Sequence, residues 1–193
     1  MNKHYFIFLL SFIVLYSCTE ETKNPVKPPL TAVIEQDINA SHANYQYYSF
    51  ATGDTLPFAD SSTANWDIAF KGTSVIVNGG TGKAGVGGVI IMDTLFSEVT
   101  EAPTAGYVQE SASAAIPTGS NNGWYNYAGP PNHTITPLAG KVFVIKTGAG
   151  KYAKMEFISY YKGAPATPNG LLDISKYYTI RFVYQADGST SLK

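Results

Sequence analysis

The chain has one cysteine, three histidines and few charged residues, and each shortage excludes a class of protein. With Cys18 as its only cysteine the chain forms no internal disulfide, so its fold depends on core packing. Its 13 Lys and Arg against 14 Asp and Glu provide no basic field for nucleic acid. The apolar run at residues 5–16 is too short to span a bilayer as a helix, which needs about 20 residues.

That short apolar run is typical of a bacterial lipoprotein signal peptide. Lys3 provides a basic start, and a small residue, Ser17, precedes the cysteine that takes the lipid. The alternative is an ordinary secretory signal followed by a free thiol. We predict a signal peptide at residues 1–17, lipidation of Cys18 and attachment to the outer membrane.

Residues 18–30 follow as a predicted lipid-anchored tether. The segment contains Pro25, Pro28 and Pro29 and almost no apolar side chain, and proline-rich spacers stay extended. Glu20 and Glu21, directly after the cysteine, resemble the surface-export signal of Bacteroidetes lipoproteins, which implies exposure on the cell surface. Residues 31–193 have the length of one domain.

Alternation of apolar and polar residues predicts strands in that domain. Residues 152–161 place Ala153, Met155, Phe157 and Ser159 on one face, with Lys154, Glu156 and Ile158 on the other. Residues 177–185 alternate likewise. Residues 141–147 and 150–161 are joined by a Gly-rich connection that predicts a β-hairpin. Further short strands are expected at 45–50, 66–70, 73–78, 89–93 and 124–127.

The expected fold is therefore all-β: a single antiparallel domain, sandwich-like or a partly open barrel. No window predicts an amphipathic helix of about ten or more residues. Charged residues are 14% of the chain and aromatic residues 13%, so material for an aromatic core is ample.

A glycine-rich segment at residues 79–88 raises the question of nucleotide binding. Gly80, Gly82 and Gly85 match the G-x-G-x-x-G spacing, but that motif needs a following helix N-terminus. Residues 89–91 (VII) are typical of a strand instead. We predict a flexible loop or a glycine-lined turn.

Groups for catalysis are sparse. His42 and His133 lack the spacing of a metal site, and no serine near them lies in a nucleophile elbow. Carboxylates such as Asp67, Glu98 and Glu101 are scattered. We predict a binding protein and no enzyme.

Five sequence blocks resemble the HmuY family of haem-binding lipoproteins from Bacteroidetes. In order they are 65–70 (NWDIAF), 78–82 (NGGTG), 99–103 (VTEAP), 123–125 (GWY) and 150–161 (GKYAKMEFISYY). The resemblance runs from about residue 45 to 184. It implies an all-β surface lipoprotein that captures haem and delivers it to a TonB-dependent outer-membrane transporter. Within it, we expect Trp66 to be a structural anchor and Asp67 to bind backbone groups of an adjoining turn.

The resemblance also implies where haem would bind. The best-studied member holds haem iron with two histidines from separate loops. The position of the second ligand falls here at Gly129, and His133, four residues on, is the nearest candidate metal ligand. The loop of the first ligand, residues 104–122, offers only Tyr107. The alternative for His133 is a solvent-exposed loop histidine.

Other family members use methionine, so Met92 is a second candidate ligand, with core packing as its alternative. Met155 is expected in the core. Tyr107, Tyr125 and Tyr127 are candidates to stack on a porphyrin or to ligate as phenolates. The resemblance thus predicts a haem site near residues 124–135. The alternative function is a non-haem binding or assembly module on the same fold, recognising a glycan, a peptide or an envelope partner.

Overall fold

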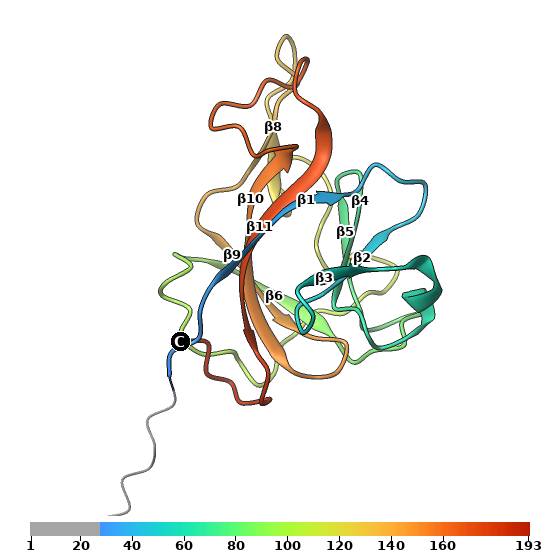
Figure 1. Cartoon of the computed structure of the whole chain (residues 1–193), viewed down its shortest axis with the longest axis vertical. Helices are drawn as coiled ribbons and strands as arrows, with labels where there is room; N and C mark the ends of the chain where they lie inside the picture. The colour runs from blue at the N-terminus through green and yellow to red at the C-terminus, as the bar shows by residue number, and fades with distance from the viewer. Residues whose placement is uncertain (1–27) are drawn as a thin grey trace, which may run out of the picture.

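Antiparallel strands form three sheets in the computed structural model, which describes residues 28–193 (Figure 1). The predicted signal peptide, Cys18 and most of the tether lie outside the described residues. The elements are β1 (Val33–Asn39), β2 (Gln46–Ser49), β3 (Asp54–Leu56), the 3-10 helix η1 (Phe58–Ser62), β4 (Ile68–Lys71), β5 (Ser74–Val77), β6 (Gly88–Asp93), β7 (Tyr125–Tyr127), β8 (Ile135–Pro137), β9 (Lys141–Lys146), β10 (Tyr152–Tyr161) and β11 (Ser175–Gln185). No helix among these residues is long and apolar enough to cross a membrane.

The largest sheet has five strands in the order β1-β11-β10-β9-β6, and a smaller sheet has the order β3-β2-β4-β5. β7 and β8 form a separate two-stranded hairpin. All named pairs are antiparallel, and neither large sheet closes on itself. The predicted all-β class is confirmed.

The main core lies between the two large sheets. It joins buried residues of the smaller sheet, such as Phe70, to buried residues of the larger one, such as Met155 and Tyr178. The rings of Phe70 and Tyr178 meet with centroids 4.8 Å apart. Aromatic pairs at this separation stabilise beyond their buried area, so the aromatic composition supplies the core directly.

A second cluster covers the opposite face of the large sheet. Val142 and Val144 point into it, while their neighbours Phe143 and Ile145 point into the main core. The sheet is therefore apolar on both faces. This cluster includes Phe96, Val99, Ala102, Val183 and Leu192, with Met92 and Tyr107 packed against it.

The second cluster covers this face of the sheet. Lys154 of β10, which alternation alone would place in solvent, is therefore buried. Lys154 is only 5% exposed, and its ammonium group donates hydrogen bonds to the carbonyl oxygens of Phe96 (3.1 Å) and Val99 (2.7 Å). Burial, and then the charge of Arg181, lower the pKa of Lys154. The lysine fixes the segment after β6 onto the sheet.

All eight predicted strands are present, at β2, β4, β5, β6, β7, β9, β10 and β11. The predicted hairpin between residues 141 and 161 is confirmed, because β9 pairs with β10. The sequence interpretation missed β1, β3, β8 and the short η1.

The glycine-rich segment is a tightly packed turn. A Cβ atom on Gly79 would lie 1.9 Å from the carbonyl oxygen of Gly87, so no side chain fits there. Asn78 holds the segment, since its Oδ1 accepts from the N–H of Gly85 at 3.0 Å. The glycines allow backbones to approach one another, and the expectation of a glycine-lined turn is confirmed.

The NWDIAF block anchors the smaller sheet. Trp66 is 1% exposed, and its indole N–H donates to the carbonyl oxygen of Ser61 at 3.2 Å. The carboxylate of Asp67 accepts from the N–H of Phe50 (2.8 Å) and of Gly148 (3.0 Å). Asp67 thus connects the end of β2 to the β9–β10 turn, and the prediction that it binds backbone groups is confirmed.

The buried carboxyl of Asp67 should make stability depend on pH. Desolvation by burial raises its pKa from 3.8 to about 6, although the two backbone N–H groups oppose the shift. The folded state holds this proton more tightly than the unfolded chain does. The Asp67 contribution is therefore favourable below pH 4, and the free energy of unfolding should fall by about 3 kcal/mol as the pH rises through 6.

Urea unfolding across this pH range measures the effect. Asp67→Asn should flatten the profile and also destabilise the protein, because an amide has only one oxygen for two N–H donors. Asp93→Asn, at an exposed carboxylate paired with Lys141, is the matched control. An unchanged slope in Asp67→Asn would show that other groups cause the dependence.

Candidate functional site

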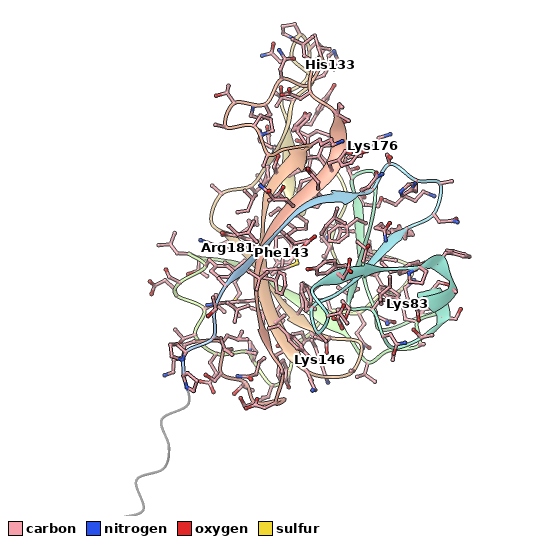
Figure 2. The ribbon with its side chains drawn as sticks, in the orientation of Figure 1. Lys83, His133, Phe143, Lys146, Lys176 and Arg181 are labelled. Carbon is pink, nitrogen blue, oxygen red and sulfur yellow. The ribbon has the colours of Figure 1, made fainter. Side chains whose placement is uncertain are left out.

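The candidate site is the end of the molecule where β10 finishes and β11 begins. We call it the tip: the β7–β8 hairpin with its loop 128–134, and loop 162–174 between β10 and β11. Figure 1 shows both loops projecting beyond the two large sheets, and Figure 2 places His133 at the outer end.

Trp124 fixes the base of the hairpin. It is 1% exposed, and its indole N–H donates to the carbonyl oxygen of Thr73 at 2.9 Å. Its ring packs against Phe157 and Tyr178, with centroids 4.8 and 5.1 Å away. The hydroxyl of Tyr161, the last residue of β10, accepts from the N–H of Ile135 at 2.9 Å, at the start of β8. The hairpin is thereby held by the core at one end and exposed at the other.

His133 lies in the exposed loop of this hairpin. Its backbone N–H donates to the carbonyl oxygen of Gly129 at 2.8 Å, and the N–H of Ala128 donates to that of Thr134 at 2.9 Å. His133 has a positive φ of 52°, which directs the chain sharply back into β8. The turn presents the imidazole to solvent.

Tyr127, the last residue of β7, contacts the imidazole of His133 across the hairpin loop. Its hydroxyl forms a hydrogen bond with Nδ1 of His133, and the ring centroids are 5.9 Å apart. Tyr127 is 41% exposed, so the pair lies at the surface. The bond engages Nδ1 and leaves Nε2 as the nitrogen available for a metal ion.

Loop 162–174 packs directly against the hairpin loop. The N–H of Gly170 donates to Oγ1 of Thr134 at 3.3 Å. A Cβ atom on Gly170 would lie 2.4 Å from the carbonyl oxygen of His133 and 2.5 Å from that of Asn132, so only glycine permits this approach. The two loops therefore form one surface around His133.

That surface is apolar and exposed. Leu171 is 67% exposed, Leu172 81% and Ile174 60%. Two lysines border it: Lys176 follows the loop at the start of β11, and Lys162 begins it, with its ammonium 5.4 Å from the ring centroid of Tyr177. Apolar side chains, cations and an imidazole are thus combined at the tip.

The predicted site residues occupy three places. Tyr127 and His133 are together at the tip. Tyr125 is 8% exposed and packs against Trp124 in the main core. Met92 packs against the second cluster, on the far face of the large sheet.

Tyr107 belongs to the second cluster as well. Its ring meets that of Tyr152, the first residue of β10, at 6.1 Å, and burial raises the pKa of its hydroxyl. The tip adjoins Tyr161, the last residue of the same ten-residue strand. The two ends of β10 are about 30 Å apart, at about 3.3 Å per residue. The structure therefore does not bring Tyr107 to His133.

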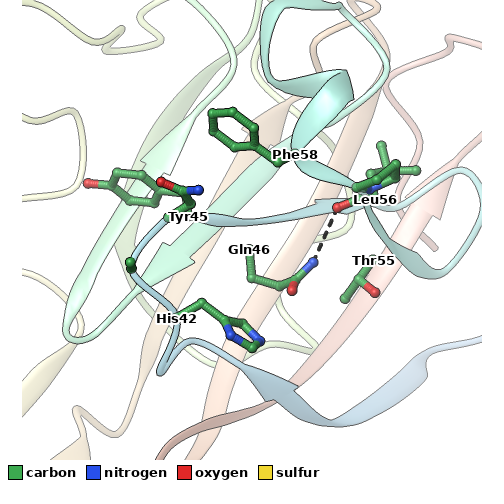
Figure 3. A pocket seen from close by; sticks show the side chains of 9 residues that line it. His42, Tyr45, Gln46, Thr55, Leu56 and Phe58 are labelled. Atoms are coloured by element: carbon green, nitrogen blue, oxygen red, sulfur yellow. Dashed lines mark hydrogen bonds between the residues drawn. The ribbon is translucent and has the colours of Figure 1, made fainter.

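Clefts are found elsewhere on the described residues. One of about 510 Å³ is lined by residues at the start of β2 and around β3, including His42, Tyr45 and Phe58. Figure 3 shows it, with the hydrogen bond from Nε2 of Gln46 to the carbonyl oxygen of Leu56 (3.3 Å). Another of about 440 Å³ borders Asp67. Within residues 28–193 no three His, Cys, Asp or Glu side chains cluster as a metal site.

Comparison with known proteins identifies the fold and the family. The family model described as HmuY protein matches residues 41–184. An HmuY-like haem-binding protein of Bacteroides vulgatus superposes with a TM-score of 0.50 at 20% identity, covering 79% of this chain and 91% of that one. A lipoprotein of Bacteroides fragilis gives 0.52 at 17% identity, covering 79% and 90%.

The apo HmuY analogue of Tannerella forsythia gives a TM-score of 0.54 at 18% identity, covering 84% of this chain and 99% of that one. No curated protein sequence matches significantly. These identities support the shared fold, and the family match extends over most of the domain. The chain belongs to the HmuY family.

Proposed function

We propose that this protein binds haem non-covalently at the tip and passes it to an outer-membrane transporter for iron acquisition. Membership of the HmuY family and the HmuY-like haem-binding neighbour support haem as the ligand. In this proposal the protein catalyses no reaction. It provides an apolar surface and an iron ligand, and lipidated Cys18 holds it on the cell surface, as the sequence pattern and the lipoprotein neighbour suggest.

The observation that carries the proposal is the arrangement of His133. An exposed imidazole whose Nδ1 is engaged by Tyr127 presents Nε2 outward, as histidines that ligate metals generally do. Haem iron accepts such a nitrogen as an axial ligand. The surrounding apolar side chains suit the faces of a porphyrin. His133 would therefore hold the iron, and the second axial position is left to solvent or to another donor.

The cleft of about 510 Å³ favours one alternative, recognition of a glycan on the same fold. Its lining combines polar side chains such as Asn44 and Gln46 and aromatic ones such as Phe58 with His42 and the aliphatic Leu56 and Pro57. Aromatic faces and amides are suited to a neutral polyol. Glycan binding with no porphyrin binding would support this second function.

Titration with haemin tests the proposal. The purified protein should produce a saturable, shifted and sharpened Soret band at micromolar haem. A spectrum that remains the sum of free haemin and protein throughout the titration would rule the proposal out.

Tyr127→Phe should weaken haem binding by about tenfold, because the imidazole loses the partner that orients it and that can accept from Nδ1–H when Nε2 binds iron. Binding of metal-free protoporphyrin should stay unchanged, since no iron bond is involved. Absorbance and fluorescence titrations measure the two affinities.

Tyr177→Phe is the matched control for this prediction, because it removes a hydroxyl at the base of loop 162–174. It should bind haem as the unmodified protein does. Equal haem affinity in Tyr127→Phe and the unmodified protein would contradict an orienting role for Tyr127.

A further inference from the structure

The tip exposes three large apolar side chains that lie close together in the sequence. Leu172, at 81%, is the most exposed large hydrophobic side chain of the described residues, and Leu171 and Ile174 exceed half exposure. These three lie within four consecutive residues. Contiguous exposed apolar groups mark ligand or protein contact sites, whereas single ones need no explanation.

The backbone holds these side chains in place. The N–H of Asn169 donates to Oδ2 of Asp173 at 2.7 Å, and the N–H of Leu171 donates to Oδ1 of Asn169 at 3.0 Å. The N–H of Lys162 donates to the carbonyl oxygen of Ile174 at 2.9 Å, which closes the loop at its base. The leucines are therefore presented on a preorganised loop, which lowers the entropic cost of binding.

Two lysines at the ends of loop 162–174 provide cations that can pair with an anionic group of an apolar ligand. Two acids of this region accept from backbone N–H groups: Oδ2 of Asp173 from Asn169 at 2.7 Å, and Oδ1 of Asp37 from Gly163 at 2.7 Å. Lys162 and Lys176 border the apolar surface from the two ends of the loop. A flat apolar molecule with carboxylates on one edge matches this combination of leucines and cations.

We infer that loop 162–174 is the second wall of the porphyrin site, with Leu171 and Leu172 covering a face of the ring. Lys162 and Lys176 pair with its carboxylates. The inference rests on the proposed function and adds a surface that does not depend on iron. The wall adjoins His133 because Gly170 lies against its carbonyl oxygen. It explains how a site with one histidine ligand gains further affinity, since apolar contact adds to coordination.

Leu171→Ser/Leu172→Ser tests the wall. Both side chains are exposed, so the double variant should fold as the unmodified protein does. Its affinity should fall by about thirtyfold, because two leucine contacts with the ring are lost. The loss should be equal for haemin, followed by absorbance, and for metal-free protoporphyrin, followed by fluorescence.

Leu95→Ser is the matched control, at a leucine 63% exposed outside the tip, and should leave both affinities unchanged. If the unmodified protein binds porphyrin but the double variant binds equally well, the wall is refuted while the proposed function stands. If the unmodified protein binds neither porphyrin, both fail. A change in sedimentation of the double variant without a change in affinity would also overturn the wall, because it would make the patch a contact between copies of the chain.

Discussion

Trp124→Ala should lower the free energy of unfolding by about 3–5 kcal/mol, the largest stability effect expected from one side chain here. The indole is 1% exposed and contacts the rings of Tyr125, Phe157, Tyr160 and Tyr178. Its removal leaves a cavity at the base of the tip. Urea unfolding followed by circular dichroism measures the loss.

The hydrogen bond of Trp124 adds to this effect. Alanine leaves the carbonyl oxygen of Thr73 without its indole donor. Trp124→Phe keeps one aromatic ring, but it removes the donor and leaves a smaller cavity than alanine does, so it should cost about 1–3 kcal/mol. Leu95→Ala, at an exposed leucine, is the control and should cost little. A loss below about 1 kcal/mol in Trp124→Ala would contradict the anchoring role.

His133→Ala should lower haem affinity by about a hundredfold or more, the largest binding effect expected. Losing a partner of a metal-bound histidine already costs about 10–100-fold, and losing the ligand itself should cost at least as much. Metal-free protoporphyrin should bind as before, because its contacts do not include iron. Titrating the variant with haemin and with metal-free protoporphyrin distinguishes a residue that binds the iron from one that only contacts the ring.

His42→Ala is the matched control, because His42 is the other histidine of the described residues and lines the cleft at β2 and β3. Its haem affinity should equal that of the unmodified protein. If His42→Ala and not His133→Ala weakened haem binding, the site would be in the wrong place. Equal losses for both porphyrins in His133→Ala would mean that the imidazole packs against the ring without binding iron.

Strand positions followed from the sequence where period-two alternation extends over many residues. β10 and β11 were predicted on this basis, and Ile180 and Phe182 point into the main core as expected. β1 was missed because its alternation is interrupted. Its register with β11 shifts between Glu35 and Ile38, where Asp37 has a φ of 60°. β3 and β8 have three residues each, too short for a periodic signal, and they lack the aromatic residues of the equally short β7.

The site was harder to predict from the sequence than the fold. Sequence spacing does not tell which face of a sheet is covered by a second layer, so Met92 and Tyr107 were placed with His133 as candidates although they pack on the far face. The pairing of Tyr127 with His133 depends on hairpin register, which sets Tyr127 opposite Ile135. Loop 162–174 was not recognised. Its signal was two adjacent leucines, residues 171 and 172, in a segment otherwise rich in Gly, Pro and Ala.

The most direct measurement is the anomalous scattering of iron from crystals of the protein grown with haemin. The account predicts an iron peak at the tip, bonded to Nε2 of His133, with the porphyrin lying against Leu171 and Leu172. An iron peak in the cleft beside His42, or a porphyrin bound away from both tip loops, would contradict it.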